Sequence, residues 1–264
     1  MEYQFLSEEY KKKCEVQGTQ EVFNYDYKGV KQECLVYLPY DYSKDKNYKF
    51  VYLMHGGGGN IHRLFRVIDD SCPLQNALDH MFYHKEISDL IIVCPTYFGY
   101  EEGSDEELVK KFSHKLTTAL LTSVENHYGS QGYLTREERV FGGYSMGAVT
   151  TYWQFIQSLD YFKYFIPMSG ECWVKGQLGG GKYPKETAYY LANYASNKGL
   201  PFEIYQFVGE AGIAYQHVPQ QIEEMYKYKE VFNEDNLKYF VSPYVHDSIY
   251  ANEYLYNALP LIFK

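Results

Sequence analysis

The chain has 264 residues, of which 45% are hydrophobic and 22% are charged, and this balance is typical of an ordinary globular protein. The composition excludes disordered, collagen-like and coiled-coil proteins. The longest clean apolar run, Leu90 to Cys94, is far shorter than the roughly 18–20 residues of a membrane span. The formal net charge of −9 argues against a basic surface, so we expect no binding to nucleic acid. We expect no membrane partner either. The length favours one domain over residues 1–264.

Strand patterns come first along the chain and then alternate with helix patterns. In order, we expect strands at 21–27, 33–38 and 49–54, a helix at 74–83, a strand at 89–94, a helix at 106–127 and a strand at 139–141. A helix from Met146 follows, then a strand at 165–168, a helix at 187–194, a strand at 202–208, a helix at 219–228, a strand at 237–241 and a helix at 248–259. Such alternation predicts a largely parallel sheet with right-handed crossovers, and the early strands predict an antiparallel edge. The expected fold is α/β, with three layers.

The helix predicted over residues 106–127 is the longest in the chain. Its apolar side chains recur every four residues, at Leu108, Phe112, Leu116, Leu120 and Val124. Apolar residues at such a spacing form a stripe along one side of a helix. We therefore expect one long amphipathic helix.

The sequence GYSMG, residues 143–147, matches the G-x-S-x-G pattern of a nucleophile elbow. Such an elbow needs a strand that turns sharply into a helix, with the serine at the apex in a strained conformation. A predicted strand precedes the motif and a predicted helix follows it, which is the required context. The flanking glycines allow neighbouring backbone to approach closely. The pattern predicts Ser145 as a catalytic nucleophile.

A glycine run, HGGGGN, follows the strand predicted over residues 49–54. In esterases with a nucleophile elbow, the loop after this strand supplies one N–H of the oxyanion hole, and the residue after the nucleophile supplies the other. We therefore expect the backbone N–H groups of Gly57 and Met146 to be the two donors. The run lacks the Lys-Ser/Thr that follows in a P-loop, which argues against a phosphate site.

The general base is predicted from chain order, because in this fold the serine is followed by the acid and then by the histidine. Only His217 and His246 follow Ser145. His246 lies between the last predicted strand and the last predicted helix, where the base belongs. We expect His246 to take the proton of Ser145 and to return it to the leaving alcohol.

Two further patterns resemble ligand sites but lack a required part. Residues 176–182, GQLGGGK, match a P-loop except that Tyr183 stands where Ser or Thr should hold magnesium, so we expect a mobile loop. His80 and His84 lie four apart on a predicted helix, a spacing that can bind zinc, but no third ligand has a supporting spacing. We expect a solvated helix face there and no metal ligands.

Several short segments occur in an order that is much more specific than the elbow alone. They are Cys14 with Gly18 and Thr19, residues 36–42 (VYLPYDY), residues 52–58 (YLMHGGG), the elbow, residues 168–170 (MSG) with Trp173, Gly209 with residues 213–215 (IAY), and His246 with Asp247. In these segments the chain resembles the feruloyl and acetyl-xylan esterases of carbohydrate esterase family one, within the α/β-hydrolases. The resemblance implies an α/β-hydrolase fold, hydrolysis of ester-linked hydroxycinnamate or acetate from xylan, and no cofactor. It also implies a secreted enzyme, although residues 1–13 show no apolar signal-peptide core.

One position departs from the family pattern. Family members carry the triad aspartate in a G-x-x-D pattern after the penultimate strand, whereas this chain reads GEAG, with Gly212 at the acid position. A histidine without an orienting carboxylate loses control of its tautomer, which costs about 10⁴ in turnover. Three alternatives stay open: Glu210 orients the histidine, Asp247 or Glu171 replaces it, or the enzyme works as a weakened dyad. We favour Glu210.

The expected function is a serine esterase that forms an acyl-enzyme and acts on feruloylated or acetylated xylan and its oligosaccharides. Trp173 follows a predicted strand near the expected cleft, where its indole would stack on a phenolic ring or a sugar, although a buried packing role also fits. One alternative is a small-acyl esterase of the S-formylglutathione hydrolase type. The other is a carbohydrate-binding module that has lost hydrolysis, which Gly212 motivates.

Overall fold

The computed structural model describes residues 2–88, 90–129 and 134–263, in which eight strands form one sheet. The strands lie in the order β1-β2-β4-β3-β5-β6-β7-β8. They are β1 Thr19–Tyr27, β2 Val30–Leu38, β3 Lys49–Met54, β4 Leu90–Cys94, β5 Arg139–Tyr144, β6 Tyr164–Met168, β7 Glu203–Gly209 and β8 Leu237–Ser242. Strands β1, β2 and β4 pair antiparallel, and the remaining pairs are parallel. The predicted antiparallel edge is confirmed; Asp89, the first residue of one predicted strand, lies outside the described residues.

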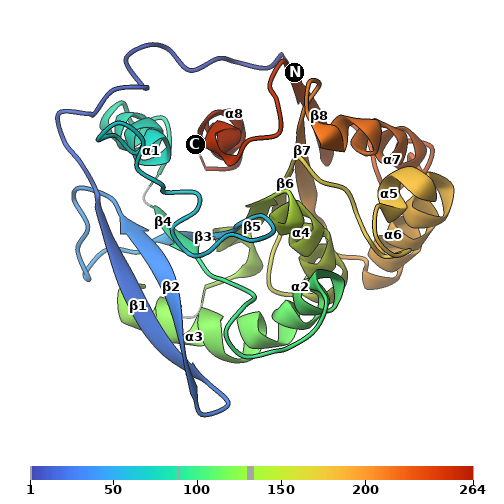
Figure 1. Cartoon of the computed structure of the whole chain (residues 1–264), viewed down its shortest axis with the longest axis horizontal. Helices are drawn as coiled ribbons and strands as arrows, with labels where there is room; N and C mark the ends of the chain where they lie inside the picture. The colour runs from blue at the N-terminus through green and yellow to red at the C-terminus, as the bar shows by residue number, and fades with distance from the viewer. Residues whose placement is uncertain (1, 89, 130–133, 264) are drawn as a thin grey trace.

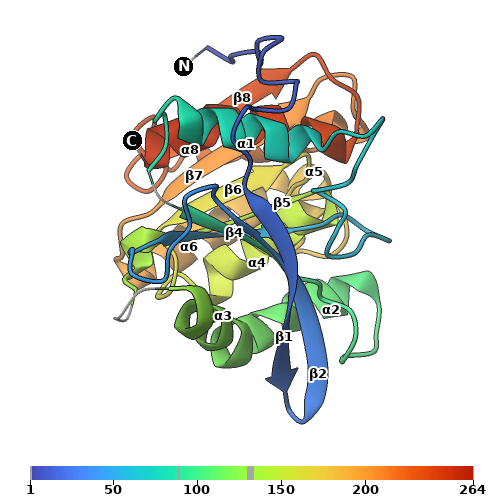
Figure 2. The same ribbon diagram turned by 90° about the vertical axis from the view of Figure 1, so that its left-hand side faces the viewer.

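Helices cover both faces of the sheet and make three layers (Figure 1). One face carries α1 Pro73–Tyr83 and α8 Ala251–Ile262, which lie side by side in both ribbon views (Figure 2). The other face carries α2 Asp105–Lys115, α3 Leu121–Tyr128, α4 Met146–Gln157, α6 Pro184–Lys198 and α7 Val218–Met225. Each interface is filled by its own cluster of buried apolar side chains. The predicted α/β class and three-layer arrangement are confirmed.

Strand β3 shows why the sequence favours this arrangement. Phe50 and Tyr52 belong to the apolar cluster on the α4 side, whereas Val51 and Leu53 belong to the cluster beneath α1 and α8. Successive side chains of a strand point to opposite faces, so a strand covered on both faces needs an unbroken apolar run. All four side chains are fully buried.

The helix predicted over residues 106–127 is not one continuous α-helix. A π-helix, η1 Leu116–Leu120, separates α2 from α3. In an α-helix of 3.6 residues per turn, side chains four apart drift by about 40° at each step, so a long four-residue repeat leaves the buried side. The wider turn of the π-helix offsets this drift. As a result, the five apolar residues of the stripe, from Leu108 to Val124, are all buried.

The glycines Gly179 and Gly180 within residues 176–182 are buried, whereas the sequence led us to expect a mobile loop. This segment contains a short helix, α5 Gly179–Lys182. A Cβ atom on Gly180 would lie 2.2 Å from Oε1 of Gln221, and one on Gly181 would lie 2.2 Å from Nδ1 of His217. The glycine run therefore allows close packing against the start of α7.

The N-terminal segment, residues 2–18, runs over α1 and α8 (Figure 2). The backbone N–H of Gln4 donates to Oδ1 of Asn257 at 2.8 Å on α8. On α1, the Asn76 amide donates to the carbonyl of Lys11 at 3.0 Å. Side chains of both helices thus satisfy backbone groups of a segment that has no regular secondary structure of its own.

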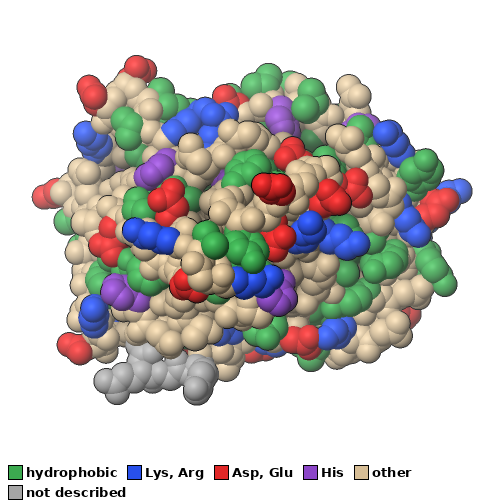
Figure 3. All heavy atoms as spheres, turned by 60° about the horizontal axis from the view of Figure 1, so that its bottom comes forward, with side chains coloured by type: hydrophobic (Ala, Val, Ile, Leu, Met, Phe, Trp, Pro, Cys, Tyr) green, Lys and Arg blue, Asp and Glu red, His purple; other side chains and the backbone are tan. Residues whose placement is uncertain are grey.

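The surface in Figure 3 carries Lys and Arg side chains interspersed with Asp and Glu, and neither sign gathers into a large patch on that face. Among the described helices, none is both long and apolar enough to span a bilayer.

Candidate active site

Ser145 lies at the sharp turn from β5 into α4. Its backbone has φ +57° and ψ −114°, a conformation that costs energy for a residue with a Cβ atom. A Cβ on Gly143 would lie 2.5 Å from the carbonyl oxygen of Gly147, and one on Gly147 would lie 2.2 Å from that of Met54. The two glycines of the motif are therefore required by backbone packing around the turn. The predicted elbow geometry is present.

The turn brings Ser145 to His246, which lies in the loop between β8 and α8. Nε2 of His246 is 2.9 Å from Oγ of Ser145. The Tyr144 ring packs on the imidazole with a centroid separation of 5.1 Å. Burial lowers the pKa of His246, and the nearby charge of Asp247 opposes this shift. A neutral imidazole at this place can accept the hydroxyl proton.

The loop after β3 lies directly against the elbow. A Cβ on Gly56 would lie 3.3 Å from Cβ of Ser145, and one on Gly57 would lie 3.2 Å from Cγ of Met146. Met146 is the first residue of α4, so its N–H has no partner four residues earlier in the helix. The two N–H groups that we expect to form the oxyanion hole thus come from neighbouring segments beside the serine.

His55 fixes the orientation of the peptide between Gly56 and Gly57. The Gly56 carbonyl accepts a hydrogen bond from Nδ1 of His55 at 2.7 Å and one from the Gly59 N–H at 3.1 Å. Because a trans peptide points its C=O and N–H in opposite directions, the Gly57 N–H faces away from these donors. Burial lowers the pKa of His55, which favours the neutral imidazole. Because Nδ1 of this ring donates to the Gly56 carbonyl, Nε2 accepts a hydrogen bond from the Thr96 hydroxyl at 2.8 Å. Sequence analysis missed this role. The available signal was a histidine that directly follows a buried strand and precedes a run of glycines.

A cavity of about 410 Å³ opens beside the serine and the histidine. Trp173 lines it and is 8% exposed, and its Nε1 donates to Oε1 of Glu171 at 2.8 Å. Burial raises the pKa of Glu171. Sequence analysis predicted Met146 as an oxyanion-hole donor but assigned no role in the site to the other lining residues. They come from α4 and from the segments after β6 and β7: Val149, Ser169, Gly170, Gln177, Leu178, Ile213, Ala214, Gln216 and His217.

The hydrogen bond expected between Glu210 and His246 is absent from the structure. Nδ1 of His246 is buried and has no hydrogen-bond partner among the described residues, and Glu210 is exposed. Asp247 instead accepts a hydrogen bond from Nη2 of Arg66 at 2.5 Å, and the Glu171 carboxylate accepts one from the Trp173 indole N–H. None of the three expected carboxylates therefore orients the imidazole. The arrangement in the structure is a Ser–His pair.

Gly212 lies next to the histidine, which explains the missing contact. A Cβ on Gly212 would be 3.2 Å from the backbone nitrogen of His246 and 3.5 Å from its Cα. A carboxylate side chain on this residue would start beside the backbone of His246, whereas the glycine offers none. The backbone of Gly212 has φ −96° and ψ 154°, which any residue adopts.

Comparison with known proteins places these observations in a family. The family model described as an esterase matches residues 28–246, which is most of the chain. The chain belongs to the Esterase family. It is a carboxylic ester hydrolase with an α/β-hydrolase fold, as the sequence resemblance implied.

Individual relatives resemble this esterase in sequence, in fold or in both. It is 33% identical over 245 residues to endo-1,4-beta-xylanase Y of Acetivibrio thermocellus; this covers 86% of the chain but only 21% of the relative's length. The feruloyl esterase module of Clostridium thermocellum, solved as a mutant with sinapinate, superposes with a TM-score of 0.82 at 29% identity, covering 100% of this chain and 94% of that one. S-formylglutathione hydrolase from Staphylococcus aureus has a TM-score of 0.68 at 17% identity, covering 95% and 98%, and shares the fold.

The lowered pKa of His246 predicts the acid limb of the activity profile. Catalysis requires the neutral imidazole, so activity rises as pH increases through this pKa, and the midpoint should lie below the ordinary histidine value of 6.5. Asp247→Asn removes the charge that opposes the shift and should move the midpoint further down. The measurement is kcat/KM against pH with an activated ester; a wild-type midpoint at or above 6.5 would contradict the prediction.

The packing of Gly147 predicts the effect of a single methyl group. In Gly147→Ala the new Cβ meets the Met54 carbonyl, which belongs to the end of β3, so the elbow and the glycine loop must separate. Overpacking of this kind costs about 1–3 kcal/mol. Urea denaturation should show a lower free energy of unfolding, together with reduced turnover. Unchanged stability would mean that the turn tolerates the methyl group.

Proposed function

We propose that this esterase is a serine feruloyl esterase that releases hydroxycinnamoyl groups from arabinoxylan. The observation that carries the proposal is the 2.9 Å contact between Oγ of Ser145 and Nε2 of His246, which line the same cavity as Trp173. The likeness to a feruloyl esterase module solved with sinapinate supports an aromatic acyl group. The likeness to part of a xylanase supports a xylan-derived substrate and an enzyme that acts outside the cell.

In the proposed mechanism, Oγ of Ser145 attacks the ester carbonyl while Nε2 of His246 takes its proton. The N–H groups of Gly57 and Met146 stabilise the negative oxygen of the tetrahedral intermediate, and losing one such donor typically costs roughly 2.7–4 kcal/mol. The protonated His246 then gives its proton to the leaving alcohol, which leaves an acyl-enzyme. Water attacks this ester with His246 as the base, and the acid is released as Ser145 is restored.

His246 works without an orienting carboxylate in this mechanism. Its tautomer must carry the proton on Nδ1, because Nε2 accepts the serine hydroxyl. In a triad the acid selects that tautomer and stabilises the imidazolium, and replacing it lowers turnover by about 10⁴. Burial against Tyr144 keeps the imidazole neutral and in place, and the oxyanion hole does not depend on the acid. We therefore propose a slow esterase.

The cavity favours an aromatic acyl group over acetate. Trp173, Val149 and Ile213 give it an apolar wall, and a phenolic ring would bury area against them. An acetyl group would leave most of the roughly 410 Å³ unfilled. Acetyl-xylan is therefore the weaker candidate substrate.

Substrate preference tests the proposal. We expect burst release of phenol from an activated cinnamoyl ester, and higher kcat/KM on methyl ferulate than on acetylated xylan or a short-chain thioester. Ser145→Ala should abolish turnover and acylation while leaving the fold intact. Preference for short thioesters would favour the S-formylglutathione hydrolase type, and ligand binding without acylation would favour a binding module.

Restoring the acid tests the dyad. Gly212→Asp should raise kcat at least about tenfold, part of the ~10⁴ that an orienting carboxylate contributes, because its side chain starts beside His246. Glu210→Gln is the matched control, since its exposed side chain makes no bond to the imidazole, and it should retain wild-type turnover. A folded Gly212→Asp protein with unchanged kcat, or a large loss in Glu210→Gln, would contradict the dyad.

A further inference from the structure

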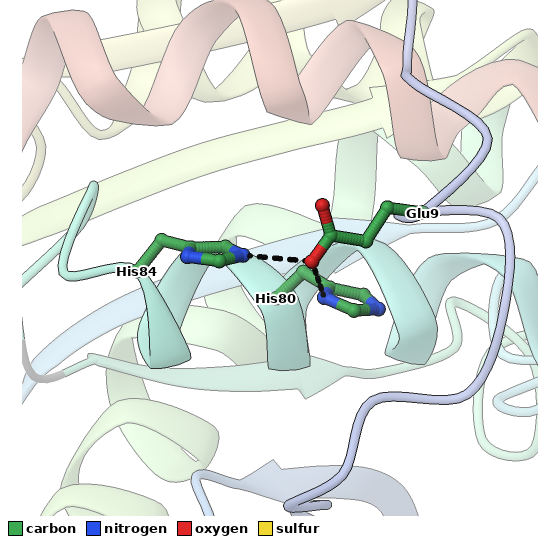
Figure 4. Close-up of side chains that lie close together, drawn as sticks. All are labelled: Glu9, His80 and His84. Carbon is green, nitrogen blue, oxygen red and sulfur yellow. Dashed lines mark hydrogen bonds and ion pairs between the residues drawn. The ribbon is translucent and has the colours of Figure 1, made fainter.

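His80 of α1, His84 at the C-terminal cap of this helix and Glu9 of the N-terminal segment converge at the surface (Figure 4). Oε1 of Glu9 is 3.2 Å from Nε2 of His84 and 3.8 Å from Nδ1 of His80. The three ligand atoms all lie within 4.8 Å of one another. The third ligand that the helix spacing of His80 and His84 lacked in the sequence therefore comes from the segment that crosses α1.

His80 gives an independent reason to place a cation here. It is 6% exposed, and its Nε2 lies 3.2 Å from the carbonyl oxygen of Lys12. Because a carbonyl only accepts, Nε2 carries the proton and Nδ1 of the neutral ring holds a lone pair. Nδ1 is buried, has no hydrogen-bond partner within the described part of the chain, and faces the Glu9 carboxylate, another acceptor. Two acceptors that face each other are satisfied by a bound cation.

The surroundings hold the ligands in place. The centroid of the Tyr10 ring lies 5.0 Å from that of His80 and 5.7 Å from that of His84. The Tyr10 hydroxyl donates a hydrogen bond to Glu86 at 2.6 Å. The bond from His80 to the Lys12 carbonyl fixes the tautomer and orientation of the imidazole, as outer hydrogen bonds do for histidine ligands in metal sites.

We propose that Glu9, His80 and His84 bind a divalent transition-metal ion of the zinc class. Zinc takes imidazole nitrogens and carboxylate oxygens at about 2.0–2.2 Å, usually in a tetrahedron. The distances between the three ligand atoms are close to the edge lengths of such a tetrahedron. The side chains would have to move slightly closer together to bind the ion. The Glu9 and His84 side chains are 60% and 36% exposed, which leaves the fourth position open to water. None of these residues lines the catalytic cavity, so the ion would fasten the N-terminal segment to α1.

The test is zinc titration of the full chain, by isothermal calorimetry after chelator treatment. We expect one zinc ion per chain and higher thermal stability with zinc. Glu9→Gln and His84→Ala should each weaken binding at least about tenfold and lose the zinc-dependent increase in melting temperature. His62→Ala, which removes an exposed histidine outside the cluster, should bind zinc like the wild type.

Cobalt gives a second measurement that does not depend on stability or on esterase activity. Bound Co²⁺ should produce the visible absorption of a low-coordinate nitrogen and oxygen site in the wild type and in His62→Ala, but not in His84→Ala. Absence of zinc and cobalt binding to the wild type would overturn the proposal. So would binding that is equally tight in Glu9→Gln, or a loss of melting temperature in Glu9→Gln that is the same with and without zinc, because the cluster would then be an ion pair only.

Discussion

The site depends on one contact, between the Ser145 hydroxyl and the His246 imidazole. The two residues are 101 positions apart in the chain, and the parallel sheet brings them together because the carboxyl ends of β5 and β8 lie at the same edge. The contact also needs the strained φ of Ser145, which the surrounding backbone must enforce. That backbone packs so tightly at Gly143 and Gly147 that neither position has room for a Cβ atom. The sheet topology and the two glycines that flank Ser145 thus bring its hydroxyl to the His246 imidazole.

The missing acid changes how the imidazole is held. In a triad, the carboxylate fixes the ring through Nδ1, but here Nδ1 has no hydrogen-bond partner among the described residues. A buried donor without a partner costs about 1–3 kcal/mol, so His246 is held in place at the expense of stability. The position of the His246 ring is therefore set by burial, by packing against the Tyr144 ring and by the backbone of its loop. The same burial that lowers its pKa keeps His246 a neutral base, which partly offsets the absence of the acid.

Local patterns predicted the parts of the molecule that depend on local physics. Short apolar runs and their alternation with helix patterns predicted the strands, and the spacing of glycines around Ser145 identified the elbow. The failures came from long-range geometry. The four-residue repeat predicted a helix but not its π-helical segment. The apolar stripe has to stay on one side of the helix only because the helix packs against the sheet, and the repeat alone does not show that packing. The family's G-x-x-D pattern, with Gly212 at the acid position, led us to favour Glu210, yet only the fold reveals that this residue is exposed and makes no hydrogen bond to the imidazole. Similarly, Glu9 meets His80 and His84 only because the N-terminal segment crosses α1.

The crossing of the N-terminal segment also bears on His246, the proposed general base. The Tyr3 hydroxyl donates to Oε2 of Glu253 on α8 at 2.8 Å, and the Tyr244 hydroxyl donates to Oε1 of the same carboxylate at 3.0 Å. Tyr244 stacks on Tyr250 with a centroid separation of 3.9 Å, and these two rings flank the loop that carries His246. The buried Glu253 carboxylate thus connects the N-terminal segment to Tyr244 in that loop, and the stacking of Tyr244 on Tyr250 connects the two sides of the loop. Because no acid fixes Nδ1, the position of the imidazole depends on how firmly this loop is held.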